Sequence, residues 1–288
     1  MSNKAHFKIG TCSWKYDSWI GLIYSEEAKV NYLKAYAEHF STVEIDQWFW
    51  SLYPNNIIKL PSIPVVKEYA ESVPDDFLFS IKAPNSITLT HYYSQDKTKP
   101  LIENPIFFSN DILNEFLNRL ALMGSKVGPI IFQFEYLNKM KMPNQQLFLE
   151  KLHVFLDAAP KDFQYAIEIR NPKYLNMEYF EFLKSHDVAH TFLEGYYMPP
   201  ISEVYQKAKG QIKDYTVIRL HGPNRQEIEA MTQNKWNEIV ASKDEELDAI
   251  TGMIQDLIDR GVEPIVNVNN HFEGSAPKTI QRILSRFK

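Results

Sequence analysis

Short apolar runs alternate with amphipathic segments along the chain. The runs have the length and the β-branched and aromatic content of strands, while the segments between them space apolar residues three and four apart, as in helices that bury one face. Strands are predicted over residues 7–13, 42–49, 77–83, 127–134, 164–169, 188–193, 215–220 and 264–268. Helices are predicted over residues 28–40, 63–73, 109–123, 143–160, 177–185, 202–209, 244–260 and 277–287.

This order of elements predicts an α/β protein with a TIM (β/α)8 barrel, because repeated strand–helix units build a parallel sheet and eight of them suggest closure. An open doubly wound sheet is the alternative. No linker rich in Gly, Ser or Pro divides the chain, so residues 1–288 are interpreted as a single domain. Two long connections, 85–108 and 222–243, would lie on the C-terminal face, where barrels carry their active sites.

Polar residues lie at the C-terminal ends of most predicted strands, often two positions apart. Period two places such pairs on one face of a strand. Charges are costly against packed helices, so we expect this face to be the interior mouth of the barrel. The pairs are Glu44 and Asp46, Gln133 and Glu135, Glu168 and Arg170, Arg219 and His221, and Asn267 and Asn269; Lys82, Asn270 and His271 complete the set.

This mixture of charges suits an anionic ligand. Arginine and lysine bind phosphate or carboxylate, nearby glutamates and histidines can transfer protons, and amides and aromatic rings can orient a sugar or a base. The predicted catalytic residues are Glu44, Glu168, His221 and His271. The predicted substrate-binding residues are Trp14, Tyr16, Lys82, Gln133, Arg170, Arg219, Asn269 and Asn270.

Buried ion pairs with a purely structural role are the alternative interpretation. Glu44 with Arg219 and Glu168 with Arg170 are the pairs expected in that case. Plain packing would instead fill these positions with Val, Ile and Leu, which favours a functional site. For the aromatic residues after the first three strands, packing of the loops against helices is the alternative to stacking on a ligand.

A metal site is a further option for the same residues. Its candidate ligands are Glu44, Asp46, Glu168, His221 and His271. The cations predicted beside them would repel a divalent ion, so we expect no metal and no cofactor. Glycine is scarce, with 10 residues, and neither a glycine-rich phosphate loop nor a G-x-S-x-G motif occurs.

Composition narrows the class of protein. The one cysteine, Cys12, excludes a disulfide framework within the chain and is interpreted as a packing residue. The formal net charge of -5 gives no support to a protein that coats nucleic acid, although a local basic site remains open. No signal sequence and no stretch of about 20 apolar residues is found, so we expect a cytoplasmic protein without membrane contact.

Short motifs in the same order resemble the YecE-like proteins, also called domain of unknown function 72. They are residues 9–11 with Trp14, Tyr16, Trp19 and Gly21; 42–45 with Phe49; 79–84; 128–129 with 132–133; Glu168 with Arg170; 219–222; and 269–274 with 276–277. The resemblance implies a TIM barrel and brings no assigned activity. The family's barrel is similar to those of endonuclease IV and xylose isomerase, which suggests phosphodiester or sugar chemistry. Asp46 departs from the family's usual asparagine.

These observations predict an enzyme, a hydrolase or an isomerase, that acts on a phosphorylated or nucleic-acid-derived anion by general acid–base chemistry at the mouth of the barrel. One alternative is a non-catalytic barrel that binds a ligand or nucleic acid. The other is a metal-dependent phosphodiesterase or sugar isomerase related to endonuclease IV and xylose isomerase. The expected partner is accordingly a small anionic ligand or nucleic acid, and the oligomeric state stays open.

Overall fold

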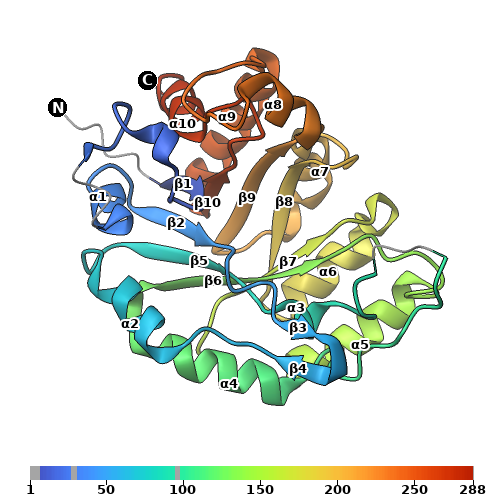
Figure 1. The fold of residues 1–288 in the computed structure, drawn as a ribbon. Helices are drawn as coiled ribbons and strands as arrows, with labels where there is room; N and C mark the ends of the chain where they lie inside the picture. The colour runs from blue at the N-terminus through green and yellow to red at the C-terminus, as the bar shows by residue number, and fades with distance from the viewer. Residues whose placement is uncertain (1–6, 27–30, 95–97, 288) are drawn as a thin grey trace.

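Eight parallel strands form a closed barrel in the computed structural model, which describes residues 7–26, 31–94 and 98–287. The strands are β1 (Lys8–Cys12), β2 (Thr42–Ile45), β5 (Leu78–Lys82), β6 (Val127–Phe134), β7 (Tyr165–Ile169), β8 (Ala189–Gly195), β9 (Tyr215–Gly222) and β10 (Glu263–Val268). The barrel closes because β1 pairs with both β2 and β10. The predicted TIM barrel is therefore confirmed, and the open sheet is excluded (Figure 1).

Helices on the outside of the barrel follow the strands (Figure 1). They are α1 (Tyr32–Ala37), α2 (Ile63–Glu71), α4 (Asn110–Leu120), α5 (Gln145–Ala158), α6 (Met177–Ser185), α7 (Ile201–Ala208), α9 (Asp244–Asp259) and α10 (Ala276–Leu284). Ser109 caps α4, since its hydroxyl accepts a hydrogen bond from the Ile112 amide at 3.3 Å. Residues 28–30 of the first predicted helix lie outside the described residues.

Several short elements on the connections were not predicted. They are the hairpin strands β3 (Leu52–Tyr53) and β4 (Ile57–Ile58), the helices α3 (Asn85–Thr88) and α8 (Arg225–Thr232), and the 3-10 turns η1 (Asp17–Trp19), η3 (Pro54–Asn56), η4 (Ala121–Lys126), η5 (Pro172–Tyr174) and η6 (Lys209–Gln211). The hairpin, α3 and α8 follow the C-terminal ends of β2, β5 and β9, so they border the mouth of the barrel.

The predicted strand over 42–49 is too long. The structure ends β2 at Ile45, and a turn follows in which the Phe49 amide donates to the Asp46 carbonyl at 3.1 Å. The apolar and aromatic residues that suggested a longer strand are buried in this turn instead, as Trp48 and Phe49 show. Asp46 therefore starts a loop at the mouth.

The interior of the barrel changes from apolar to polar along the strands. A small cluster of buried apolar side chains, distinct from the main apolar core, has one member on each of β6, β7, β8 and β9: Ile131, Ala166, Ala189 and Val217. Two residues further along the same strands stand Gln133, Glu168, Thr191 and Arg219, all buried. Because side chains two apart share a face, the polar set lies directly above the apolar set, toward the C-terminal mouth. No described helix is long and apolar enough to cross a membrane.

Candidate functional site

Arg219 lies at the centre of the mouth and is almost completely buried. Its Nε and Nη2 atoms donate to the two carboxylate oxygens of Glu44 at 2.6 and 2.7 Å. Its Nη1 atom donates to Glu168 and, at 3.2 Å, to the amide oxygen of Gln133. Four strands, β2, β6, β7 and β9, thus bring one guanidinium together with two carboxylates and one amide.

Glu168 joins this network to Arg170. The Arg170 Nε donates to the second oxygen of Glu168 at 3.0 Å, and its guanidinium lies over the Tyr196 ring at 4.4 Å. Burial alone would raise the pKa of Glu168, but the charges of Arg219 and Arg170 lower it to about 2. Glu168 is therefore ionised at neutral pH, and both predicted structural pairs, Glu44–Arg219 and Glu168–Arg170, are present.

Lys82 has a different environment from Arg219 although both are buried at the mouth. Its ammonium lies 3.8 Å from the centre of the Phe49 ring. Across the described residues, no side chain forms a hydrogen bond or a salt bridge with this ammonium. Burial and the charge of Arg219 lower the pKa of Lys82 to about 8. Nearby Asp46 is only partly buried, and its pKa is raised by burial and by Glu44.

Cys12 and His221 lie next to each other, beside Glu44. The Cys12 sulfur is 3.7 Å from both a Glu44 oxygen and the His221 Nε2 atom, and the Tyr196 hydroxyl is 3.2 Å from His221 Nδ1. Burial and the Arg219 charge lower the pKa of His221, so the ring is neutral at pH 7. Burial and Glu44 raise the pKa of Cys12, which makes the thiol a poor nucleophile and agrees with its interpretation as a packing residue.

Other predicted residues lie away from this network. Trp14 packs in the helix layer, edge-on to Tyr69 at 5.0 Å. The Asn269 side-chain oxygen accepts from the His271 amide at 2.9 Å, and that of Asn270 accepts from the Ala276 amide at 2.9 Å. These two side-chain oxygens therefore hold the loop after β10, and the Asn270 side chain also hydrogen-bonds to Tyr16.

His271 and Tyr16 lie at the rim. The His271 Nε2 atom is 3.1 Å from a Glu229 oxygen on α8, and the ring contacts Trp236 at 4.9 Å. Tyr16 is half-buried, and its ring lies 4.6 Å from that of Trp19. Asn269, Asn270 and His271 thus border the mouth without joining the network around Arg219.

Tyr196 is a residue of the site that the sequence analysis missed. It follows β8, a strand for which no polar group was predicted, and it contacts both Arg170 and His221. Its position depends on Gly195, where a Cβ atom would come within 2.2 Å of the Gly222 carbonyl oxygen of β9. In the sequence, the aromatic pair Tyr196–Tyr197 directly after this glycine was the feature that could have indicated Tyr196 as a residue of the site.

Comparison with known proteins places the chain in a family. A family model described as "Protein of unknown function DUF72" matches residues 8–288. The chain belongs to the DUF72 family. The UPF0759 protein YecE of Escherichia coli (strain K12) is 26% identical over 166 residues, which cover 58% of this DUF72 chain and 49% of that relative. The match thus spans about half the length of the curated relative.

Solved structures of DUF72 proteins share the barrel. A DUF72 family protein from Thermotoga maritima MSB8 superposes with a TM-score of 0.68 at 20% identity, covering 96% of this chain and 97% of that one. A second, from Enterococcus faecalis V583, has a TM-score of 0.66 at 17% identity, covering 98% and 96%. At such identities the likeness shows the fold alone. The resemblance to the YecE-like family is confirmed, and DUF72 membership brings no activity with it.

Proposed function

We propose that this DUF72 protein is an enzyme that binds a small phosphorylated or nucleic-acid-derived anion at the barrel mouth and acts on it by general acid–base chemistry. The observation that carries the proposal is the largely buried Lys82, whose ammonium forms no hydrogen bond or salt bridge with a carboxylate among the described residues, although Glu44, Glu168 and Asp46 act on its charge at longer range. A buried charge without a partner lowers stability, and an anionic ligand would supply the missing partner.

Arg170, directly after β7, offers further donors for an anion at the mouth. Arg170 uses only its Nε atom on Glu168, and within the described residues its two Nη atoms have no hydrogen-bond partner. Arg219, in contrast, already donates four of its five N–H groups to Glu44, Glu168 and Gln133. In this proposal Lys82 and Arg170 bind the anion, and Arg219 positions the two carboxylates and Gln133.

The proton-transfer role is best supported for Lys82. A pKa of about 8 lies near physiological pH, where a group can both donate and accept a proton efficiently. Glu44 and Glu168 remain candidates for proton transfer, but their salt bridges to Arg219 favour a role as fixed negative charges that orient the site. His221 is neutral at pH 7 and can donate or accept one hydrogen bond without carrying charge.

Exposed aromatic rings support a second candidate, a barrel that binds single-stranded nucleic acid without catalysis. Trp50 is 59% exposed and Tyr93 65% exposed, and their rings lie 5.9 Å apart. Trp50 also contacts Phe49, the ring beneath Lys82, at 5.3 Å. Rings next to a cation suit a base stacked beside its phosphate.

Binding of inorganic phosphate and of adenosine 5′-monophosphate tests the anion site. Titration calorimetry of the wild-type protein should detect both, and Lys82→Met should weaken both at least tenfold. Lys67→Met is the matched control, because Lys67 is an exposed lysine on α2 and its loss should leave both affinities unchanged. Equal affinity in the wild type and Lys82→Met would exclude Lys82 as the anion-binding group.

Turnover separates the two candidate functions. Phosphate monoesters and diesters with a chromogenic leaving group should be converted by the wild type and not by Lys82→Met, and Glu168→Gln should lose turnover while largely keeping phosphate binding. Binding of phosphate without turnover of any tested ester, together with oligonucleotide affinity that falls steeply with salt, would support the non-catalytic alternative.

A further inference from the structure

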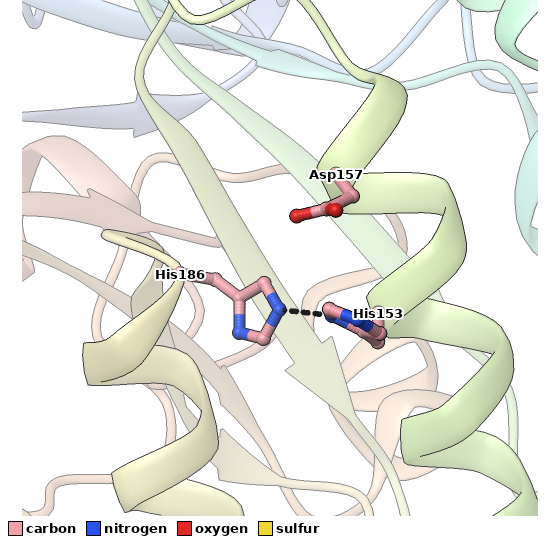
Figure 2. A group of neighbouring side chains, drawn as sticks. All are labelled: His153, Asp157 and His186. Atoms are coloured by element: carbon pink, nitrogen blue, oxygen red, sulfur yellow. Dashed lines mark hydrogen bonds between the residues drawn. The ribbon is translucent and has the colours of Figure 1, made fainter.

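Two histidines and an aspartate from neighbouring helices meet on the outer surface of the barrel (Figure 2). His153 and Asp157 stand one turn apart on α5, and His186 directly follows α6. One ligand atom from each of the three side chains lies within 4.8 Å of the others. His153 Nδ1 and His186 Nε2 are 2.8 Å apart, and Figure 2 shows both rings and the carboxylate directed into the space between the two helices.

The hydrogen bonds around His186 prepare it as a metal ligand. Its Nδ1 atom lies 2.9 Å from the Phe182 carbonyl oxygen, which can only accept, so Nδ1 carries the proton. The Nε2 atom therefore presents its lone pair to His153. Histidines that bind metals usually donate their other ring N–H to a backbone carbonyl or a carboxylate in this way, which fixes both tautomer and orientation.

The electrostatic surroundings also favour a cation. α5 ends at Ala158 and α6 ends at Ser185, so the C-terminal ends of two helices flank the three side chains. The negative end of a helix dipole stabilises positive charge within the last turn. In the part of the chain that the structure describes, the Asp157 carboxylate has no hydrogen bond or salt bridge, so its charge is available to a metal ion.

We propose that His153, Asp157 and His186 form a binding site for a first-row transition-metal ion such as Zn²⁺, with water completing a tetrahedral coordination. Imidazole and carboxylate are ligands that Zn²⁺ accepts, and three protein ligands with one water is a common arrangement. Zn–N bonds of about 2.0–2.1 Å at a tetrahedral angle separate two nitrogens by about 3.3 Å. The distance of 2.8 Å between His153 Nδ1 and His186 Nε2 therefore has to increase by about half an ångström. Loss of the proton that lies between these two nitrogens would allow this increase.

The location of the site indicates what the ion would do. Asp157 lies shortly before β7 and His186 shortly before β8, so the site is at the N-terminal end of the barrel, opposite the mouth. Residues at this end of TIM barrels contribute to stability rather than to catalysis. The ion would link α5 to α6 and stabilise the folded state, because a ligand that binds only the folded chain shifts the unfolding equilibrium.

The test is Zn²⁺ binding to the full chain by equilibrium dialysis, with Co²⁺ as a spectroscopic probe. We expect one Zn²⁺ per chain, a rise in the temperature of thermal unfolding, and a tetrahedral Co²⁺ visible band. His153→Ala and His186→Ala should each weaken binding at least tenfold and remove the band, and Asp157→Asn should weaken it less. The ligands are largely exposed, so these variants should fold, which circular dichroism checks.

His39→Ala is the matched control, since His39 is an exposed histidine on another part of the surface. It should bind Zn²⁺ as the wild type does. The absence of stoichiometric binding, or equal affinity in the wild type and His153→Ala, would overturn the proposal. Loss of binding in Cys12→Ser, with His153→Ala unaffected, would also overturn it and place the metal in the mouth.

Discussion

Arg219 and Lys82 are two buried cations at the same mouth with opposite environments. Arg219, on β9, donates to two carboxylates and one amide. Lys82, on β5, has the Phe49 ring against its ammonium and, among the described residues, no hydrogen bond or salt bridge to it; Glu44, Glu168 and Asp46 act on its charge at longer range. The difference shows in their pKa values, because the carboxylates raise that of Arg219 far above its usual range whereas burial and Arg219 lower that of Lys82 to about 8.

The mouth therefore has two halves. The network around Arg219 is structural, and the surroundings of Lys82 are able to respond to a ligand. Removing one partner of a buried ion pair leaves the other charge unpaired, so the Arg219 network should tolerate little change. Removing Lys82 removes a charge that already lacks a partner, and the fold should tolerate it.

The largest expected effect is that of Arg219→Met on stability. The substitution leaves Glu44 and Glu168 buried and without their shared guanidinium, which should lower the free energy of unfolding by about 3–5 kcal/mol. Urea unfolding followed by circular dichroism measures this change. Lys82→Met removes a charge whose burial opposes folding, so it should not lower the same quantity, and an equal loss in both variants would remove the distinction between the two halves.

The second-largest effect is the loss of folding stability at low pH that comes from Glu168. The pKa of Glu168 falls from its ordinary range near 4.5 to about 2 on folding, so its charge stabilises the folded protein above about pH 4.5 and this contribution is lost as pH falls toward 2. The loss amounts to about 3 kcal/mol at most. The Glu168→Gln variant has no carboxylate at this position and lacks this pH-dependent contribution. The difference in free energy of unfolding between wild type and variant should therefore shrink as the pH falls from about 4.5 toward 2. A difference that stays constant from pH 5 to pH 2.5 would contradict the ionised pair.

The smallest effect on stability is expected for Trp50→Ala, on the Lys82 side. Trp50 is 59% exposed, so its loss should change the free energy of unfolding by less than about 0.5 kcal/mol. If a base stacks on this ring, the variant should bind a short single-stranded oligonucleotide about 1–3 kcal/mol more weakly in fluorescence anisotropy. Tyr197→Ala, at a 95% exposed ring after β8, is the control and should bind normally.

The barrel was predictable from sequence because its strands and outer helices bury regular apolar patterns. The strand 127–134 and the helix 177–185 are observed with the predicted bounds. α8 was missed because Ile228 and Thr232 are its only buried residues, so its pattern is too polar to indicate a helix. The β3–β4 hairpin was missed because two residues per strand show no periodicity.

Only part of the candidate site was predictable from the sequence. Period two correctly brought Glu168, Arg170, Arg219 and His221 to one interior surface. The sequence suggested the pairs Glu44–Arg219 and Glu168–Arg170, but it did not reveal that Arg219 also binds Glu168 and Gln133, because those contacts join strands far apart in the chain. Tyr196 joins the site through the close approach of Gly195 to β9, a three-dimensional contact that no local pattern reveals.

The most direct test of the central claim is the pKa of the Lys82 side chain, measured by NMR titration of Cε-labelled lysines, with the signal assigned by its absence in Lys82→Met. The account predicts a pKa of about 8 in the free protein, and a rise when inorganic phosphate binds and supplies the missing negative charge. A pKa above 10 that phosphate does not change would show that Lys82 is already paired or solvated, and would contradict the account.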